Sequence, residues 1–127
     1  MPIADDRRHL GDFGESAAAA YLIQQGYHIL ERKWRCPRGE IDLVAWQGNQ
    51  VVFVEVRTRR TTFYGMAEES ITTTKKLRLI DLAYCYLELH DLLDTTLWRI
   101  DVIAVVVGRQ GQIIHLNHIT SAVEQDT

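Results

Sequence analysis

Cysteine is scarce in this sequence of 127 residues, which contains only Cys36 and Cys85. Neither cysteine belongs to a CxxC motif or stands at metal-ligand spacing from a histidine, so both are interpreted as free thiols. Long apolar runs are also missing. No stretch approaches the roughly 20 residues of a membrane span, and residues 1–10 lack the apolar core of a signal peptide. We therefore expect no membrane association and, by default, a cytoplasmic location.

The chain also lacks a strong excess of one charge, because its net charge is only -3. A slightly negative net charge argues against a general nucleic-acid binder. The charges are nevertheless unevenly distributed. From Arg32 to Arg78, ten basic residues against five acidic ones give +5, whereas the remainder of the chain carries -8. A positive zone that contains acids suggests a polyanion brought to a metal, and an exposed charged face is the alternative interpretation.

Apolar residues make up 46% and charged residues 24% of the chain, which is ordinary for a soluble globular protein. The length predicts one domain over residues 1–127 that buries a core without disulfides, with a polar tail from about Thr120.

The segment Gly39–Arg57 predicts a β-hairpin. Two runs rich in Val and Ile, Ile41–Trp46 and Val51–Val56, flank a turn centred on Gly48-Asn49, where both residue types tolerate positive φ. Side chains alternate along a strand, so one face of this hairpin is wholly aliphatic and is expected to be core.

The other face of the hairpin carries charge. The predicted register places Asp42 opposite Glu55 and Glu40 opposite Arg57. Opposed carboxylates repel each other, and either a shared proton or a divalent cation with oxygen ligands would offset the repulsion. The alternative is that the strand ends splay apart and both acids are solvated, each beside an arginine.

The other elements follow from hydrophobic periodicity and turn signals. We expect, in chain order, a helix over about Ala4–Gln25 with a break at Gly11 or Gly14 as the alternative, a short strand Tyr27–Leu30, a basic segment Glu31–Arg38, a helix over about Thr73–Leu89, a buried strand Leu97–Val107 and a last strand Gln112–Ile119.

Two basic segments are candidates for phosphate contacts. The segment Thr58–Gly65 leaves the acidic end of the hairpin and carries Arg59 and Arg60, although it could equally be a mobile surface loop. Cations in the first turns of a helix oppose the helix dipole, and a bound phosphate would offset that mismatch. The second helix begins with three such residues, Lys75, Lys76 and Arg78, for which a solvated face is the alternative.

This order of elements, with Asp on the second strand and Glu-X-basic on the third, resembles the PD-(D/E)XK nuclease superfamily. Its restriction-endonuclease-like fold is α/β, with an αβββαβ core and a mixed central sheet flanked by helices. The chain is more closely similar to the YraN family, whose members resemble Holliday-junction resolvases. The motifs that carry this resemblance are Gly14-Glu15, Gly39–Ala45, Val52–Arg59, Lys75 with Arg78, and Arg99–Ala104.

The resemblance implies an endonuclease that depends on Mg²⁺ or Mn²⁺ and hydrolyses phosphodiester bonds in DNA, structured or branched DNA included. Its metal ligands would be Asp42, Glu55 and the carbonyl of Val56. The catalytic residues would be Asp42, Glu55, Arg57 and the helix-borne Glu15. The expected nucleic-acid contacts are Arg38, Arg59, Arg60, Lys75, Lys76 and Arg78. The sequence leaves open whether the protein forms a homodimer.

Arg57 departs from the superfamily pattern, in which a lysine usually occupies this position. Arginine stays protonated and cannot act as a general base, but it can hold a phosphate oxygen. Lys75 is the nearest candidate to supply an ammonium group. The competing hypotheses are a nuclease-fold module that binds nucleic acid or a protein without cutting, and a structural protein whose acids pair with Arg57 and Arg38.

Overall fold

The computed structural model describes residues 3–61 and 71–123. Its elements, in chain order, are α1 (Ile3–Gln24), β1 (His28–Cys36), β2 (Gly39–Gln47), β3 (Gln50–Arg60), α2 (Thr73–Leu89), β4 (Leu97–Val107) and β5 (Ile113–Val123). The strands form one sheet in the order β1-β2-β3-β4-β5. Only β3 and β4 run parallel, and the other neighbours are antiparallel. The predicted mixed α/β sheet with an αβββαβ core is confirmed.

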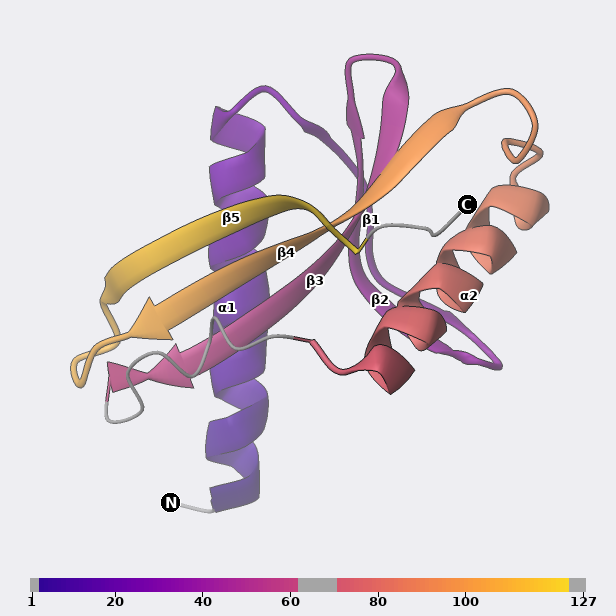
Figure 1. Ribbon diagram of the computed structural model, residues 1–127. Helices are drawn as coiled ribbons and strands as arrows, with labels where there is room; N and C mark the ends of the chain where they lie inside the picture. The colour runs from indigo at the N-terminus through magenta and orange to yellow at the C-terminus, as the bar shows by residue number, and fades with distance from the viewer. Residues whose placement is uncertain (1–2, 62–70, 124–127) are drawn as a thin grey trace.

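The two helices cover opposite faces of the sheet, as Figure 1 shows with α1 behind the strands and α2 on the other side. On the α1 side, Ala18, Ala19 and Leu22 are fully buried against Val54 and Ile103. Small alanine side chains let the helix approach the strands closely. At Gly14 the approach is closer still, because an added Cβ would overlap the Thr58 side chain.

On the other face, α2 buries its apolar stripe against the β1–β3 strands and the start of β4. Tyr86 makes edge-to-face contacts with Trp34 on β1 and Phe53 on β3. The helix begins after Thr72, whose side-chain oxygen accepts a hydrogen bond from the Lys75 backbone N–H at 3.2 Å. This cap satisfies one of the free N–H groups at the helix start.

The β2–β3 hairpin has the predicted turn and register, with Gly48 at a φ of 62° and Trp46 paired with Val51. Its ladder ends at Leu43↔Val54. Ile41 packs among the apolar residues under α2, whereas Leu43 packs among those under α1 on the opposite face of the sheet. In a regular strand, residues two apart would share a face. The single aliphatic face predicted for both residues is therefore wrong, because β2 changes its alternation where it leaves β3.

Three predicted strand lengths are also wrong. The basic segment predicted after Leu30 is the second half of β1, which pairs with β2 as far as Cys36↔Gly39. β3 continues through Arg60 beside β4, so the predicted loop starts later, and its residues 62–65 lie outside the described residues. β5 continues to Val123 because it pairs with β4. In each case a neighbouring strand supplies backbone hydrogen-bond partners that local sequence does not reveal.

α1 is continuous through Gly11 and Gly14, so the alternative of a broken helix is excluded. Both cysteines are free thiols, as expected. Among the helices that the structure describes, none is long and apolar enough to cross a membrane.

Candidate metal and nucleic-acid site

Three carboxylates from α1 and β2 come together where β2 separates from β3. One oxygen each from Glu15, Glu40 and Asp42 lies within 4.8 Å of the others, and all three residues are partly buried. We call this group the acid cluster. Hard divalent cations such as Mg²⁺ prefer carboxylate oxygens, so the chemistry of the cluster fits the predicted metal.

Asp42 is held by the neighbouring strand. Its Oδ2 accepts a hydrogen bond of 2.8 Å from the Val56 backbone N–H. Burial raises the pKa of Asp42 to about 8, the nearby Glu55 carboxylate adds to the rise, and the Val56 N–H opposes it. The N–H and C=O of one strand residue point toward the same neighbouring strand, so the Val56 carbonyl also faces β2.

Glu55 is nearly buried and has a partner from α2. Its Oε2 lies 2.6 Å from Nζ of Lys75, which stands in the first turn of the helix. Asp42 and Glu55 are not paired positions in the ladder, yet they are close enough for Glu55 to raise the pKa of Asp42. The strands therefore separate at this point without leaving both acids solvated.

Two cations from β1 neutralise the acid cluster. Lys33 Nζ lies 2.8 Å from Glu15 Oε1, and Arg35 Nε lies 2.7 Å from Glu40 Oε1. The predicted cross-strand pairing of Glu40 with Arg57 is not formed, because the β2–β3 ladder ends at Leu43↔Val54. On its other side, Glu40 pairs with Arg35 in the β1–β2 ladder.

The predicted nucleic-acid residues are spread over three elements. Arg38, in the turn between β1 and β2, lies 3.9 Å from Asp81 on the exposed side of α2. On β3, Arg60 is partly buried, as is the predicted catalytic residue Arg57, and Arg59 donates to the Thr58 carbonyl at 3.1 Å. The other three are exposed at the start of α2: Lys75, Lys76 and Arg78.

Comparison with known proteins decides the family. The model of the Uncharacterised protein family UPF0102 matches residues 14–105, which include the whole acid cluster and all of α2. The chain belongs to the UPF0102 family. This membership agrees with the resemblance to YraN proteins.

Relatives in the UPF0102 family match almost the full chain. The UPF0102 protein of Roseiflexus castenholzii is 53% identical over 119 residues, covering 94% of this chain and 96% of the relative. That of Chloroflexus aurantiacus is 55% identical over 120 residues, covering 94% and 97%. That of Moorella thermoacetica is 47% identical, covering 91% and 96%. The fold described above therefore corresponds to nearly the whole length of these proteins.

Three members of this site in the UPF0102 chain were not predicted: Glu40, its partner Arg35, and Lys33. Glu40 stands two residues before Asp42, a spacing that places both on one side of a strand, so the signal was present in the sequence. Lys33 gave no local signal, because its partners Glu15 and Asp12 lie on α1.

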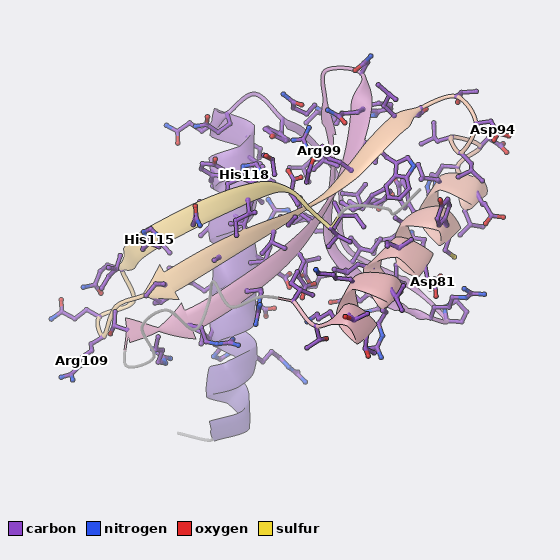
Figure 2. The ribbon with its side chains drawn as sticks, viewed as in Figure 1. Asp81, Asp94, Arg99, Arg109, His115 and His118 are labelled. Carbon is purple, nitrogen blue, oxygen red and sulfur yellow. The ribbon has the colours of Figure 1, made fainter. Side chains whose placement is uncertain are left out.

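A second polar group, inside the sheet, was also missed. Asp101 is fully buried on β4 and receives hydrogen bonds from Arg99 Nε at 2.9 Å and from the Ser121 N–H at 2.9 Å. His118 Nε2 lies 2.8 Å from Asp101 and its Nδ1 lies 3.1 Å from the Tyr21 hydroxyl. Figure 2 shows Arg99 and His118 on the neighbouring strands β4 and β5. This network joins α1, β4 and β5.

Proposed function

We propose that this UPF0102 protein is a divalent-cation-dependent endonuclease with the PD-(D/E)XK fold that hydrolyses phosphodiester bonds in DNA. The observation that carries the proposal is the acid cluster, in which Glu15, Glu40 and Asp42 present oxygens within 4.8 Å of one another. A fourth acid, Glu55 on β3, is close enough to raise the pKa of Asp42. When bound, a divalent cation would polarise the phosphate and lower the pKa of a water for attack.

The acid cluster and Glu55 have different roles in this proposal. Asp42, with Glu15 and Glu40, holds the cation, and the Val56 N–H fixes the orientation of the Asp42 carboxylate. The Val56 carbonyl supplies a further oxygen on the same side of β3. Glu55 joins the ligand set or holds Lys75 beside it, since its Oε2 contacts the Lys75 ammonium at 2.6 Å.

The basic residues of the site provide charge stabilisation. Arg57 cannot take a proton from water, but its guanidinium can bind a phosphate oxygen and stabilise the charge that develops there. Lys75 supplies the ammonium that the superfamily usually carries at the position of Arg57. Its contact with Glu55 places this group beside the acids, and it can orient a water molecule or a phosphate oxygen there.

DNA is the proposed substrate because three of the four acids of the site lie within the positive part of the chain. Residues 32–78 carry +5 although they include Glu40, Asp42 and Glu55. Phosphate contacts supply affinity without reading the bases, which suits recognition of structured or branched DNA by shape.

A nuclease-fold module that binds nucleic acid without cutting is the second candidate. The observation in its favour is that Glu15 and Glu40 already have cationic partners, Lys33 and Arg35, without a metal. Such a module would keep its DNA affinity in chelator, whereas the nuclease would require the cation.

A cleavage panel separates the two candidates. Single-stranded, duplex, flap and four-way-junction DNA would be incubated with the purified protein in Mg²⁺, Mn²⁺ or chelator, with Asp42→Asn as a control for contaminating nuclease. Cation-dependent products from the wild type alone would support the nuclease. Binding without products under all conditions would support the module. Sedimentation of the protein with and without the junction would test whether it forms a homodimer.

A further inference from the structure

The acid cluster is covered by cations from a single strand. Lys33 and Arg35 stand two residues apart on β1. Lys33 forms ion pairs with Glu15 and with Asp12, which lies outside the cluster, and Arg35 forms one with Glu40. The third acid, Asp42, instead accepts a backbone hydrogen bond from β3. The carboxylates that the proposed cation would use are thus neutralised by the protein itself.

The pairs are layered, with the cations outside and the acids inside. The Lys33 and Arg35 side chains are 43% and 75% exposed, whereas those of Glu15 and Glu40 are 15% and 31% exposed. A polyanion that approaches from solvent therefore meets the ammonium and guanidinium groups before it meets the carboxylates. The Arg35 guanidinium lies mostly in solvent, and ion pairs of exposed side chains contribute little to stability, so exchanging the partner of Arg35 is energetically easy.

The backbone of β1 holds Lys33 in an unusual conformation. Its φ is 52°, in the left-handed region that lysine seldom adopts. The flanking pairs Arg32↔Leu43 and Trp34↔Ile41 place Lys33 level with Asp42 on the adjacent strand. Such outliers persist only where surrounding contacts determine them, and they concentrate at functional sites.

We propose that Lys33 and Arg35 exchange anions when nucleic acid binds: in the free protein they neutralise Glu15 and Glu40, and a phosphodiester draws them away so that a divalent cation can bind the carboxylates. This inference rests on the proposed function, because it takes the acid cluster as the cation site and DNA as the anion. It makes cation binding and DNA binding mutually favourable, and by thermodynamic linkage each ligand strengthens the other by the same factor.

The first test needs neither DNA nor cleavage. Ca²⁺ affinity would be measured by isothermal titration calorimetry for the wild type, for Lys33→Gln/Arg35→Gln, and for Arg32→Gln/Arg109→Gln, which removes the same charge from two exposed arginines. Losing the internal counter-ions should tighten Ca²⁺ binding about tenfold, against about twofold or less for the control. Arg35→Gln alone should give about threefold, and removal of this exposed side chain does not threaten folding.

The second test adds a duplex oligonucleotide, confirmed intact on a gel, at saturating concentration. Ca²⁺ should then bind the wild type several-fold more tightly, and the Lys33→Gln/Arg35→Gln variant should show almost no such increase. Equal Ca²⁺ affinity in this variant and the control, unchanged coupling, or no Ca²⁺ binding by any protein would overturn the proposal. A wild type that shows the coupling but cleaves no DNA would support the exchange and would remove only the nuclease function.

Discussion

Asp42 is the residue at which burial and neighbouring charge act most strongly against ionisation. It stands where β2 leaves β3, with Glu15, Glu40 and Glu55 around it, and its carboxylate accepts a hydrogen bond from the Val56 N–H. Burial is the largest cause of its raised pKa. A carboxyl in this position holds a proton at neutral pH unless a cation replaces that proton.

Substitution of Asp42 by Asn should change both activity and the pH dependence of stability. The folded-state pKa is about 8 and the ordinary value is 3.8, so the native protein holds a proton that the unfolded chain releases between these values. The contribution of Asp42 to wild-type stability therefore falls as pH rises from about 4 to about 8. At pH 8 the free energy of unfolding of Asp42→Asn should exceed that of the wild type by about 1–2 kcal/mol. The same variant should lose all cation-dependent cleavage.

Urea unfolding in chelator across this pH range would measure the gain, with the exposed Asp81→Asn as the control. Parallel pH profiles for the wild type and Asp42→Asn would show that the carboxyl is not held protonated. Unchanged cleavage by purified Asp42→Asn would refute its role in the site.

Substitutions of Arg57 test the catalytic step separately from cation binding, because Arg57 is not one of the proposed cation ligands. If its guanidinium stabilises charge on the phosphoryl oxygens, Arg57→Ala should lose roughly 2.7–4 kcal/mol of transition-state stabilisation while DNA affinity changes little. Arg57→Lys should retain cleavage, because an ammonium is what the PD-(D/E)XK pattern carries there. Melting temperature, DNA affinity and cleavage would be measured on both variants. Lower stability with no cleavage by the wild type or Arg57→Lys would exclude the enzyme.

At the scale of elements, the parts that could be predicted from sequence are those with local causes. The Gly48-Asn49 turn determines the hairpin register, and hydrophobic spacing located α2 at Thr73–Leu89, where the structure has it. The second half of β1 could not be predicted, because its strand conformation depends on pairing with β2. The position of Lys33 beside Glu15 depends on the same pairing and was missed for the same reason.

The α1–β3 contact requires glycine at one position and not at another three residues away. A Cβ at Gly14 would overlap Thr58 Oγ1 and lie 2.9 Å from Thr58 Cβ, whereas a Cβ at Gly11 meets no atom within 4 Å among the described residues. Gly14→Ala should therefore destabilise the protein by about 1–3 kcal/mol through overpacking. Gly11→Ala should be neutral or stabilising by up to about 1 kcal/mol, because alanine favours the helix.

Urea unfolding of both variants measures this difference, and Thr58→Ala should partly rescue Gly14→Ala by removing the overlapping atoms. Equal stability of the two glycine variants would mean that α1 can move away from β3 without loss.

The end of β3 carries two of the proposed phosphate-binding arginines, Arg59 and Arg60. Replacing Arg59 and Arg60 by Ala should weaken DNA binding by a similar factor for all sequences, because side chains that bind phosphates do not read bases. The slope of log affinity against log salt should fall by about 1 for each phosphate that the variant no longer neutralises. Fluorescence anisotropy at several salt concentrations measures the slope, with Arg109→Ala as the control. An unchanged slope would move the interface toward Lys75 and Lys76.

For the whole molecule, β4 is the strand that connects β3 with β5 and, through Asp101 and His118, with α1. It pairs in parallel with β3, which carries Glu55, and in antiparallel with β5. Its Asp101 is fully buried, yet both carboxylate oxygens are hydrogen-bonded, through Arg99, His118 and the Ser121 N–H. The sequence shows Arg99 and Asp101 alternating on this strand but does not identify their partners on β5, because the two strands meet only when the sheet forms.

Loss of the Asp101 carboxylate should destabilise the whole fold. Burial alone would raise its pKa, but the hydrogen bonds from His118, Arg99 and the Ser121 N–H lower the pKa below the ordinary value of 3.8. The stabilisation is therefore present at neutral pH and is lost as pH falls below about 4. Asp101→Asn leaves Arg99 without its buried partner and should cost roughly 3–5 kcal/mol, a large part of the roughly 5–15 kcal/mol of a typical domain.

Urea unfolding at pH 7 and pH 3 would measure this loss, with Asp94→Asn as the control because Asp94 is an exposed acid in the connection before β4 (Figure 2). The difference between Asp101→Asn and the wild type should shrink at pH 3, since the wild-type carboxylate is then losing its advantage over the unfolded chain. Ca²⁺ should still bind the folded fraction of Asp101→Asn, because none of the acid-cluster residues belongs to this network. A loss below about 1 kcal/mol at pH 7 would mean that water or a rearranged Arg99 replaces the carboxylate, and the network would then not be what joins α1 and β5 to β4.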